Sequence, residues 1–317
     1  MIPSSRAIKV FSGNATPNLT QAICDRLGLR LSDSDIGTFS DGEISVSLFE
    51  TVRGADVFLC NSTCAPVNNN LMELLIMIDA CKRASAARIT AVMPYFAYAR
   101  QDRKTKPRDP ISGRLVADMI AAAGAHRVLT MDLHCAQIQG FFNIPVDNLL
   151  GSPLFAEYFI KKFGEERFNM VVVSPDIGSV QRARYFARRM NMPLAIVDKI
   201  RDKANSSEVI NVIGDVKDKA VILFDDMVDT AGSMVNAAKS LKEHGATEVY
   251  ACASHAVMSG PAVNNIENSE IKEFVALDTI PAPNPKLSKL TVLSVASLFA
   301  EAIERIYEEI SISDLFV

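Results

Sequence analysis

Three acidic residues follow a buried-strand pattern in the last third of the chain. The apolar run 219–224 predicts a strand, and Asp225 and Asp226 come directly after it. Asp229 then opens the sequence Asp-Thr-Ala-Gly-Ser, and an apolar-periodic helix begins near Met234. In an open α/β sheet, ligands bind at the carboxyl ends of the strands. Free backbone N–H groups and the helix dipole favour a phosphate at such a place.

The same loop carries the groups that a phosphorylated sugar requires. Thr230 and Ser233 offer hydroxyl donors, and Gly232 lets the backbone approach a ligand closely. A phosphate cradle needs no acids, whereas two neighbouring carboxylates can accept hydrogen bonds from the vicinal hydroxyls of a sugar or hold a hydrated Mg²⁺. The loop therefore predicts a ribose 5-phosphate site, although an ordinary βα turn with acidic N-caps is an alternative. The predicted site consists of Asp225, Asp226, Asp229, Thr230, Ala231, Gly232 and Ser233.

The whole chain has the composition of a soluble globular protein. Its 317 residues suffice for two domains, 49% are apolar, 22% are charged, and the mean hydropathy is +0.15. No apolar run approaches the roughly 20 residues of a membrane span, and the first residues lack a signal-peptide core. The net charge of −4 argues against a dedicated nucleic-acid surface. Six scattered cysteines without zinc spacing indicate reduced thiols and a cytoplasmic protein.

The order of the predicted elements repeats within the chain. The strand–helix–strand pattern of residues 55–93 recurs at 219–253, at an offset of 164 for the first strand and 160 for the second. The strand before Asp132 likewise matches the strand before Pro175. Strands that alternate with helices predict mainly parallel sheets.

This duplication predicts an α/β fold of two tandem, doubly wound, mainly parallel sheets. We expect an N-terminal half at 1–150 and a C-terminal half at 151–305, with the segment 306–317 packing back onto the first half. The first half has Asn61-Ser-Thr-Cys-Ala-Pro where the second has its acidic loop. Only the second half is therefore expected to keep a sugar-phosphate site, which leaves the first free for another ligand.

Two segments of the first half could bind a nucleotide. Residues 94–104 follow a predicted strand and combine aromatic side chains, which can stack a nucleobase, with Arg100, which can hold a polyphosphate. The stretch Arg100–Arg108 has five basic residues and one acid in a chain that is acidic overall, although a solvated loop is an alternative. The turn Phe39–Glu43 combines an aromatic with two acids, and alone it is better explained as a surface turn.

Further candidates stand at the ends of other predicted strands. His134 and Asp176 could ligate a metal, although a lone histidine is usually a packing or capping residue. A nucleotide with hydrated Mg²⁺ needs few protein ligands. Lys199 and Arg201 are spaced i, i+2 on an extended segment, so they share one side and suit a flap that clamps a transferring phosphoryl group. A surface hairpin with salt bridges is the competing interpretation.

Together these motifs resemble the ribose-phosphate diphosphokinase family. The acidic loop alone resembles the fingerprint of type I phosphoribosyltransferases, and that family's fold is the one expected for both halves. The wider resemblance covers nearly the whole chain, from Val10 to Phe316. It is carried by the acidic loop together with Phe39–Glu43, Tyr98–Arg103, Asp132–His134, Gln137–Phe142 and Ser174–Gly178.

The resemblance implies a reaction. The β,γ-diphosphoryl group of Mg-ATP would pass to the 1-hydroxyl of ribose 5-phosphate, giving AMP and 5-phosphoribosyl 1-diphosphate for nucleotide biosynthesis. By matching motifs, Lys199 and Arg201 would be catalytic, with Arg201 also at the sugar phosphate, and His134 and Asp176 would hold Mg²⁺. The residues implied to bind ATP are Phe39, Asp41, Gly42, Glu43, Arg100 and Gln101.

The resemblance also implies assembly and regulation. Members of the family form homohexamers, are activated by inorganic phosphate and are inhibited by ADP. The matching regulatory positions are Thr51, Arg53, Arg108, Ser311, Ser313 and Phe316.

Four residues depart from the family pattern. Ser179 replaces the second glycine of Ser-Pro-Asp-x-Gly-Gly, and it would be strained if that position required a positive φ. Ile200 replaces the middle cation of the flap, and Ser233 replaces a threonine. Cys135 places an oxidisable thiol beside a proposed metal ligand.

Two other functions compete with the synthetase. A phosphoribosyltransferase could use the acidic loop, but it would have no use for an ATP-binding cluster at residues 100–104. A non-catalytic regulatory subunit would be expected to lack the flap cations or His134, and both are present.

Overall fold

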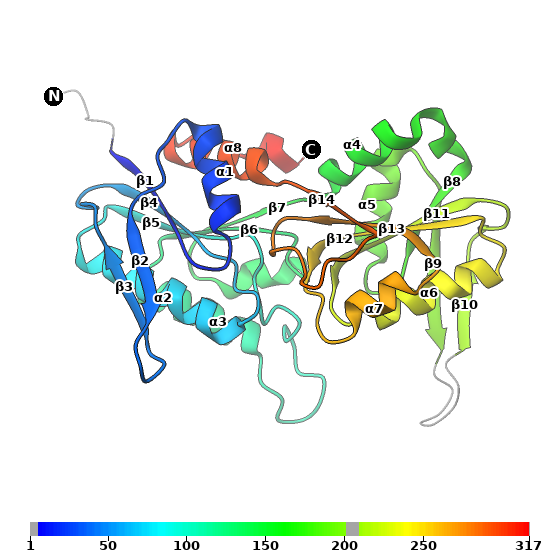
Figure 1. Cartoon of the computed structure of the whole chain (residues 1–317), viewed down its shortest axis with the longest axis horizontal. Coiled ribbons are helices and arrows are strands. Elements are labelled where there is room, and N and C mark those ends of the chain that lie inside the picture. Colours follow the sequence, from blue (N-terminus) through cyan, green and yellow to red (C-terminus); the bar gives the residue numbers. More distant parts are fainter. Residues whose placement is uncertain (1–5, 201–208, 317) are drawn as a thin grey trace. The chain divides into compact units, whose positions relative to one another are not determined.

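Two compact units make up the chain, each with its own sheet (Figure 1). The computed structural model describes residues 6–200 and 209–316, with the backbone alone at 199, 200, 209, 210 and 316. Within these ranges, no helix has the length and apolar character needed to cross a membrane. Unit 1 has a C-terminal part that begins at Ser294, earlier than the expected residue 306. Unit 1 comprises Met1–Leu150, Thr279–Pro281 and Ser294–Val317, and unit 2 comprises Gly151–Asp278 and Ala282–Leu293.

Unit 1 is built on five parallel strands in the order β1-β4-β5-β6-β7. These strands are β1 (Ile8–Ser12), β4 (Asp56–Cys60), β5 (Arg88–Met93), β6 (Arg127–Met131) and β7 (Val146–Leu149). Helices α1 (Pro17–Leu27) and α8 (Ala296–Tyr307) cover one face, and α2 (Val67–Arg83) and α3 (Ser112–Ala123) cover the other (Figure 1). The remaining elements are the antiparallel hairpin of β2 (Ser34–Thr38) and β3 (Ile44–Leu48) and the short 3₁₀ helices η1 (Ala136–Phe141) and η3 (Ser313–Phe316).

Unit 2 is built on seven strands in the order β10-β9-β8-β11-β12-β13-β14, all parallel to their neighbours except β10. These strands are β8 (Met170–Ser174), β9 (Leu194–Ile200), β10 (Val209–Ile213), β11 (Ala220–Val228), β12 (Glu248–Ala256), β13 (Ile271–Leu277) and β14 (Leu290–Leu293). One face carries α4 (Ser152–Phe163) and α5 (Val180–Met190), and the other carries α6 (Gly232–Glu243) and α7 (Ala262–Glu267) (Figure 1). The 3₁₀ helix η2 (Gly164–Asn169) follows α4.

Helices on both faces explain why the strands are apolar throughout. Every residue of β4 and β8 is buried, as expected for parallel strands covered on two sides. Local signals set the helix ends: α1 begins with Pro17 in its first turn, and Gly28 follows its last residue with a φ of 65°, a conformation that favours a residue without a Cβ. The predicted fold class, two doubly wound and mainly parallel sheets, is confirmed.

The register of the strands fixes which positions of the two units are equivalent. Cys60 pairs with Ser12 in unit 1, and Leu223 pairs with Val173 in unit 2. One residue further along this register in unit 2, Phe224 lies opposite Ser174, as Cys60 lies opposite Ser12 in unit 1. Strand β1 therefore corresponds to β8, and β4 corresponds to β11. The predicted match of β6 with β8 is therefore wrong: both strands end in polar loops, but their places in the sheet differ. By the same chain order, the β2–β3 hairpin is the counterpart of the β9–β10 hairpin.

An ion pair at the amino ends of β4 and β5 connects helix α8 to the sheet of unit 1. Arg88 donates through Nε to Asp56 Oδ2 at 2.8 Å and through Nη2 to the Ile306 carbonyl oxygen at 2.8 Å. The Asp56 side chain is only 1% exposed. Removing one partner of such a pair leaves a buried charge without compensation, which is more costly than losing an exposed pair.

We expect Arg88→Met to lower the free energy of unfolding by about 3 kcal/mol, because Asp56 would keep a buried charge. The matched control is Arg83→Met, since Arg83 pairs with Asp79 at 2.7 Å but is 78% exposed, and its effect should stay below about 1 kcal/mol. Calorimetric melting of the two variants measures the difference. Equal shifts would mean that the Arg88 contacts do not hold the helix.

Candidate active site

The acidic loop begins inside a strand, not after it. Strand β11 runs to Val228, four residues beyond the predicted end, because it continues to pair with β12 from Asp225 opposite Ala253 to Val228 opposite Ala256. The two acids therefore have a fixed backbone. Only residues 229–231 form the loop that leads into α6.

Two side chains from the start of α5 neutralise and orient this acid pair. Arg182 donates to Asp226 Oδ1 at 2.7 Å and lies 3.5 Å from Asp225 Oδ1. The Ser179 hydroxyl donates to Asp225 Oδ1 at 2.8 Å. The Asp226 side chain is 3% exposed and that of Asp225 is 19% exposed. Asp225 is thus the acid of the pair that a ligand can reach more readily.

Burial also changes the acidity of Asp225. Loss of hydration, followed by the neighbouring charge of Asp226, raises the pKa of its carboxyl to about 7, although the Ser179 and Arg182 contacts oppose the rise. The pair therefore resists holding two negative charges unless a cation or a hydrogen-bond donor arrives.

The loop after β11 is held by a neighbouring segment. Ser259 N–H donates to the Asp229 carbonyl oxygen at 2.9 Å, and Asn265 Nδ2 donates to that of Thr230 at 2.9 Å. Ala231 is 5% exposed and has a φ of 63°, a left-handed conformation that is costly for any residue with a Cβ. Gly232 then opens α6. The helix N-terminus and exposed Thr230 and Ser233 leave donors at the surface.

Asp176 follows β8, next to the acid pair in the same unit. Its Oδ1 accepts the Ser179 N–H at 2.8 Å, and the side chain is half-buried. Ser179 has a φ of −87°, so the strain considered for a serine at this position is absent. His134 follows β6 in unit 1 and is also half-buried.

The donor set suits a magnesium ion that arrives with its nucleotide. Within the described ranges there is no group of three or more His, Cys, Asp or Glu side chains placed to hold a metal. Mg²⁺ needs only one or two protein ligands when phosphates and water supply the rest. Asp176 and His134 fit that chemistry as separate ligands, and their metal role stays a prediction.

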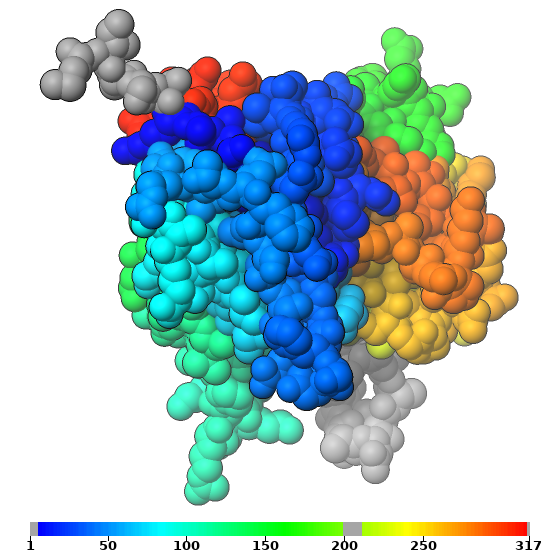
Figure 2. Space-filling view, turned by 60° about the vertical axis from the view of Figure 1, so that its left-hand side comes forward, coloured from blue at the N-terminus to red at the C-terminus, as the bar shows by residue number. Residues whose placement is uncertain are grey.

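The segment after β5 differs from the prediction in its aromatic residues. Tyr95 and Phe96 are 6% and 2% exposed, and the Phe96 and Phe142 ring centroids lie 5.6 Å apart, so neither ring is free to stack a base. Arg100 and Gln101 are exposed, and the Arg100–Arg108 segment projects from the unit (Figure 1 and Figure 2). The basic side chains of this segment, not these aromatic rings, are exposed to solvent.

The Phe39 turn joins β2 to β3 at the surface of unit 1. Phe39 is 58% exposed, so its ring faces solvent. Asp41 Oδ1 accepts the Glu43 N–H at 3.1 Å, and Gly42 has a φ of 95°. Gly42 and Glu43 line a pocket of about 390 Å³ together with Asn68, Asn69 and Met72.

The remaining predicted residues lie on unit 1 or outside the described ranges. Thr51, Arg53 and Arg108 are exposed, and Arg53 donates to Ser85 Oγ at 3.3 Å. The Ser311 and Ser313 hydroxyls lie 3.0 Å apart. The side chains of Lys199 and Phe316, and the whole of Arg201, lie outside what the structure describes.

Cys135 is less reactive than its position suggests. Its thiol donates to Asp102 Oδ2 at 3.2 Å, and burial, followed by that carboxylate, raises its pKa to about 11. At neutral pH the thiolate that would react is therefore scarce.

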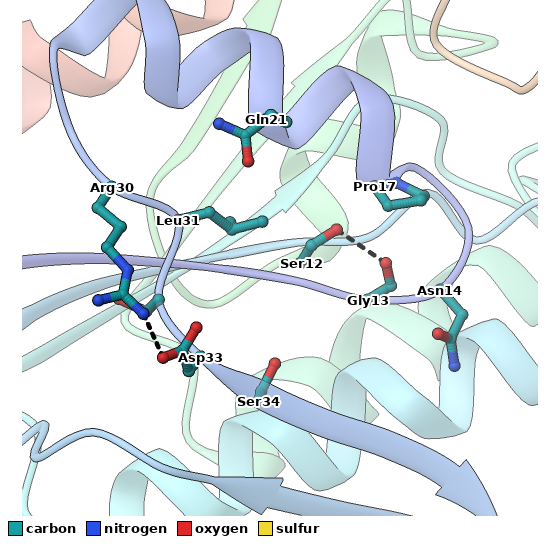
Figure 3. Close-up of a pocket in the computed structure, with 10 residues that line it drawn as sticks. Ser12, Gly13, Asn14, Pro17, Gln21, Arg30, Leu31, Asp33 and Ser34 are labelled. Atoms are coloured by element: carbon teal, nitrogen blue, oxygen red, sulfur yellow. Dashed lines mark hydrogen bonds and ion pairs between the residues drawn. The ribbon is translucent and has the colours of Figure 1, made fainter.

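Another cavity of unit 1 contains none of the predicted site residues. It holds about 450 Å³ at the carboxyl end of β1, where Ser12, Asn14 and Gln21 line it (Figure 3). The cation in its wall, Arg30, is paired with Asp33. We therefore do not place the active site there.

Two kinds of site residue escaped the sequence argument. Arg182 pairs with Asp226, and its only signal was a basic residue in the first turn of a helix that follows a polar loop. Ser259 and Asn265 brace the acidic loop from more than 25 residues away in sequence, and nothing in their local pattern indicated that contact.

Comparison with known proteins gives the family. Residues 8–124 match the model for the N-terminal domain of ribose phosphate pyrophosphokinase, and residues 200–317 match that of the phosphoribosyl synthetase-associated domain. The chain is 63% identical to the ribose-phosphate pyrophosphokinase of Caldanaerobacter subterraneus subsp. tengcongensis, over 98% of each chain. This chain belongs to the ribose-phosphate pyrophosphokinase family. The resemblance predicted from its motifs is thereby confirmed, and with it the assignment as an enzyme that makes phosphoribosyl diphosphate.

Other ribose-phosphate pyrophosphokinases agree with this assignment. That of Clostridium perfringens is 61% identical over 98% of each chain. The crystal structure of phosphoribosylpyrophosphate synthetase from Mycobacterium smegmatis matches with a TM-score of 0.90 at 42% identity, covering 96% of this chain and 100% of the other. The shared fold extends over both units.

The raised pKa of Asp225 predicts how stability depends on pH. Between about pH 4 and pH 7 the folded protein keeps a proton that the unfolded chain has lost, so stability falls as pH rises through this window. Asp225→Asn removes the charge. We expect its melting temperature to exceed that of the wild type by a few degrees at pH 8, and the difference to vanish near pH 4. Melting curves across this range test the sign, and a difference that grows toward pH 4 would contradict it.

Proposed function

We propose that the chain transfers the β,γ-diphosphoryl group of Mg-ATP to the 1-hydroxyl of ribose 5-phosphate. The products are 5-phosphoribosyl 1-diphosphate and AMP. The observation that carries the proposal is the acid pair near the carboxyl end of β11, which a three-residue loop connects to a helix N-terminus, in a chain of the ribose-phosphate pyrophosphokinase family.

Unit 2 would bind the sugar. The phosphate lies at the start of α6, against the backbone N–H groups and the hydroxyls of Thr230 and Ser233. Asp225 accepts hydrogen bonds from the ribose hydroxyls, and Asp226, paired with Arg182, keeps that carboxylate in place. Asp229, Ala231 and Gly232 complete the loop. The Arg201 side chain would reach the sugar phosphate and the transferred group.

Unit 1 would bind ATP through exposed groups. Arg100 and Gln101 hold the phosphates, and the Phe39 turn with Asp41, Gly42 and Glu43 holds the nucleoside. His134 and Asp176 would supply the protein ligands of Mg²⁺, whose charge neutralises the polyphosphate. No protein nucleophile is needed, because positioning and charge neutralisation by Lys199 and Arg201 suffice for phosphoryl transfer.

The finer properties of the family belong to the same proposal. We infer a cytoplasmic homohexamer that inorganic phosphate activates and ADP inhibits. The positions proposed for this regulation are Thr51, Arg53, Arg108, Ser311, Ser313 and Phe316. Arg53 and Arg108 are exposed cations, which suits binding of phosphate groups.

A product assay tests the reaction. The purified chain is given ATP, ribose 5-phosphate, Mg²⁺ and inorganic phosphate, and AMP and ADP are followed separately. AMP should form in step with phosphoribosyl diphosphate and only with the sugar present. ADP formation would indicate an ordinary kinase. An enzyme that instead consumes phosphoribosyl diphosphate and a base, without ATP, would be a phosphoribosyltransferase, and binding without turnover would indicate a regulatory subunit.

Lys199→Ala tests the proposed flap. Because this cation should act mainly on the charge that develops during transfer, we expect kcat to fall by about 10³-fold or more with little change in the KM for ATP. Lys161→Ala, which removes an exposed lysine of α4, is the matched control and should leave both constants unchanged. A raised KM with a normal kcat would assign Lys199 to binding alone.

A further inference from the structure

Ser179 links the loop after β8 to the neighbouring strand β11 of unit 2. Its backbone N–H donates to Asp176 Oδ1 and its hydroxyl donates to Asp225 Oδ1, both at 2.8 Å. The residue is 7% exposed, so water competes little for either bond. One buried residue thus orients the carboxylates that follow β8 and lie in β11.

The Ser179 hydroxyl has no second task in the helix that it precedes. Ser179 is the N-cap of α5, yet its side chain makes no capping hydrogen bond. A serine at this position usually caps the helix with its oxygen. Here the hydroxyl is directed at Asp225, and its removal should cost α5 little.

The contacts of Asp225 converge on one of its two oxygens. Oδ1 receives the Ser179 hydroxyl at 2.8 Å, the Asp226 N–H at 2.9 Å and the Arg182 guanidinium at 3.5 Å. A carboxylate held through one oxygen presents the other in a defined direction. Asp225 Oδ2 is then the oxygen placed to meet a ligand.

Unit 1 has a corresponding tie at the equivalent place. Asn61 is the counterpart of Asp225, and its Oδ1 accepts the Ala15 N–H at 3.0 Å from the loop after β1. That tie comes from the backbone, whereas in unit 2 a side-chain hydroxyl makes it. The contact at residue 225 can therefore be removed by one substitution without changing the backbone.

We propose that Ser179 is a positioning residue of the sugar site. Its hydroxyl holds Asp225 so that Oδ2 faces the vicinal hydroxyls of ribose 5-phosphate. The proposal rests on the proposed function of the acid pair. It adds to that site a residue whose hydroxyl contacts the ligand-facing acid.

The test compares Ser179→Ala with Asp225→Asn and with the double variant. We expect Ser179→Ala to raise the KM for ribose 5-phosphate by about 3- to 10-fold, as befits loss of one hydrogen bond to a carboxylate. The KM for ATP and kcat should change less than about 2-fold. In the Asp225→Asn background the same substitution should have a smaller further effect, because an amide oxygen accepts a weaker hydrogen bond from the Ser179 hydroxyl than a carboxylate does.

Ser152→Ala is the matched control. Ser152 is a buried serine in the first turn of α4, and its hydroxyl has no hydrogen-bond partner within the part of the chain that the structure describes. Its removal should leave both KM values unchanged. Melting temperatures of all variants show whether the fold persists.

Three outcomes would overturn the inference. These are an unchanged KM for ribose 5-phosphate, an equal rise in both KM values, and full additivity with Asp225→Asn. Ser179→Thr, which keeps the hydroxyl, should restore the sugar KM to within about 3-fold of the wild type. Failure of the proposed function is distinguishable, because the wild-type chain would then release no AMP with ribose 5-phosphate.

Discussion

Two adjacent carboxylates at the end of a buried strand are the constraint around which unit 2 is arranged. Burial removes their hydration and proximity sets their charges against each other, which raises the pKa of Asp225. Two residues at the start of α5 offset the lost hydration and the repulsion: Arg182 pairs with the more buried Asp226, and Ser179 donates to Asp225. Within the described residues, these contacts reach Asp225 Oδ1 and not Oδ2. A cation, or a ligand with hydroxyl donors, would stabilise the charge on Asp225. The free energy lost on burying the pair would then be partly recovered when such a ligand binds.

Unit 1 has uncharged residues at the positions equivalent to the acids of unit 2, so no charges are buried there. Asn61 of unit 1 corresponds to Asp225 of unit 2, because each follows the fifth residue of its strand. Asn14 corresponds to Asp176, because each lies two residues after the end of its strand, β1 or β8. Both asparagines form hydrogen bonds within unit 1: Asn61 donates to the Asn70 carbonyl oxygen, and Asn14 donates to the Glu73 carboxylate. Ser62 and Thr63 are also buried and bonded, so the loop after β4 is closed to ligands. Unit 1 is therefore expected to bind through its projecting loops.

Much of the fold and of the candidate site could be predicted from the sequence, because the buried strands of parallel sheets appear as short apolar runs. Apolar runs that alternate with amphipathic helices gave the fold, and polar residues after such runs gave Asp225, Asp176 and His134. The aromatic residues after β5 were misjudged, since Tyr95 and Phe96 lie in the core and a local pattern does not tell a buried ring from an exposed one. The match of β6 with β8 failed because pairing order is not local. Arg182 was missed for the same reason: its partner is 44 residues away.

The backbone of the loops after β5, β6 and β11 includes unfavourable conformations. Four residues with a Cβ adopt positive φ in the loops after β5, β6 and β11: Tyr98 at 61°, Arg108 at 69°, Asp132 at 39° and Ala231 at 63°. Each costs about 1–2 kcal/mol and persists only where the surroundings impose it. Those surroundings are identifiable, since Ala231 is buried and the Tyr98 hydroxyl donates to Asn68. Five other described residues with a Cβ also have positive φ, among them Ser85 and Asn191 at helix ends, so this conformation alone does not mark a site. In the loops after β5 and β11, where the surroundings fix it, it means that the loops are held in shape before a ligand binds. The fold thus supplies in advance part of the ordering that diphosphoryl transfer by positioning requires.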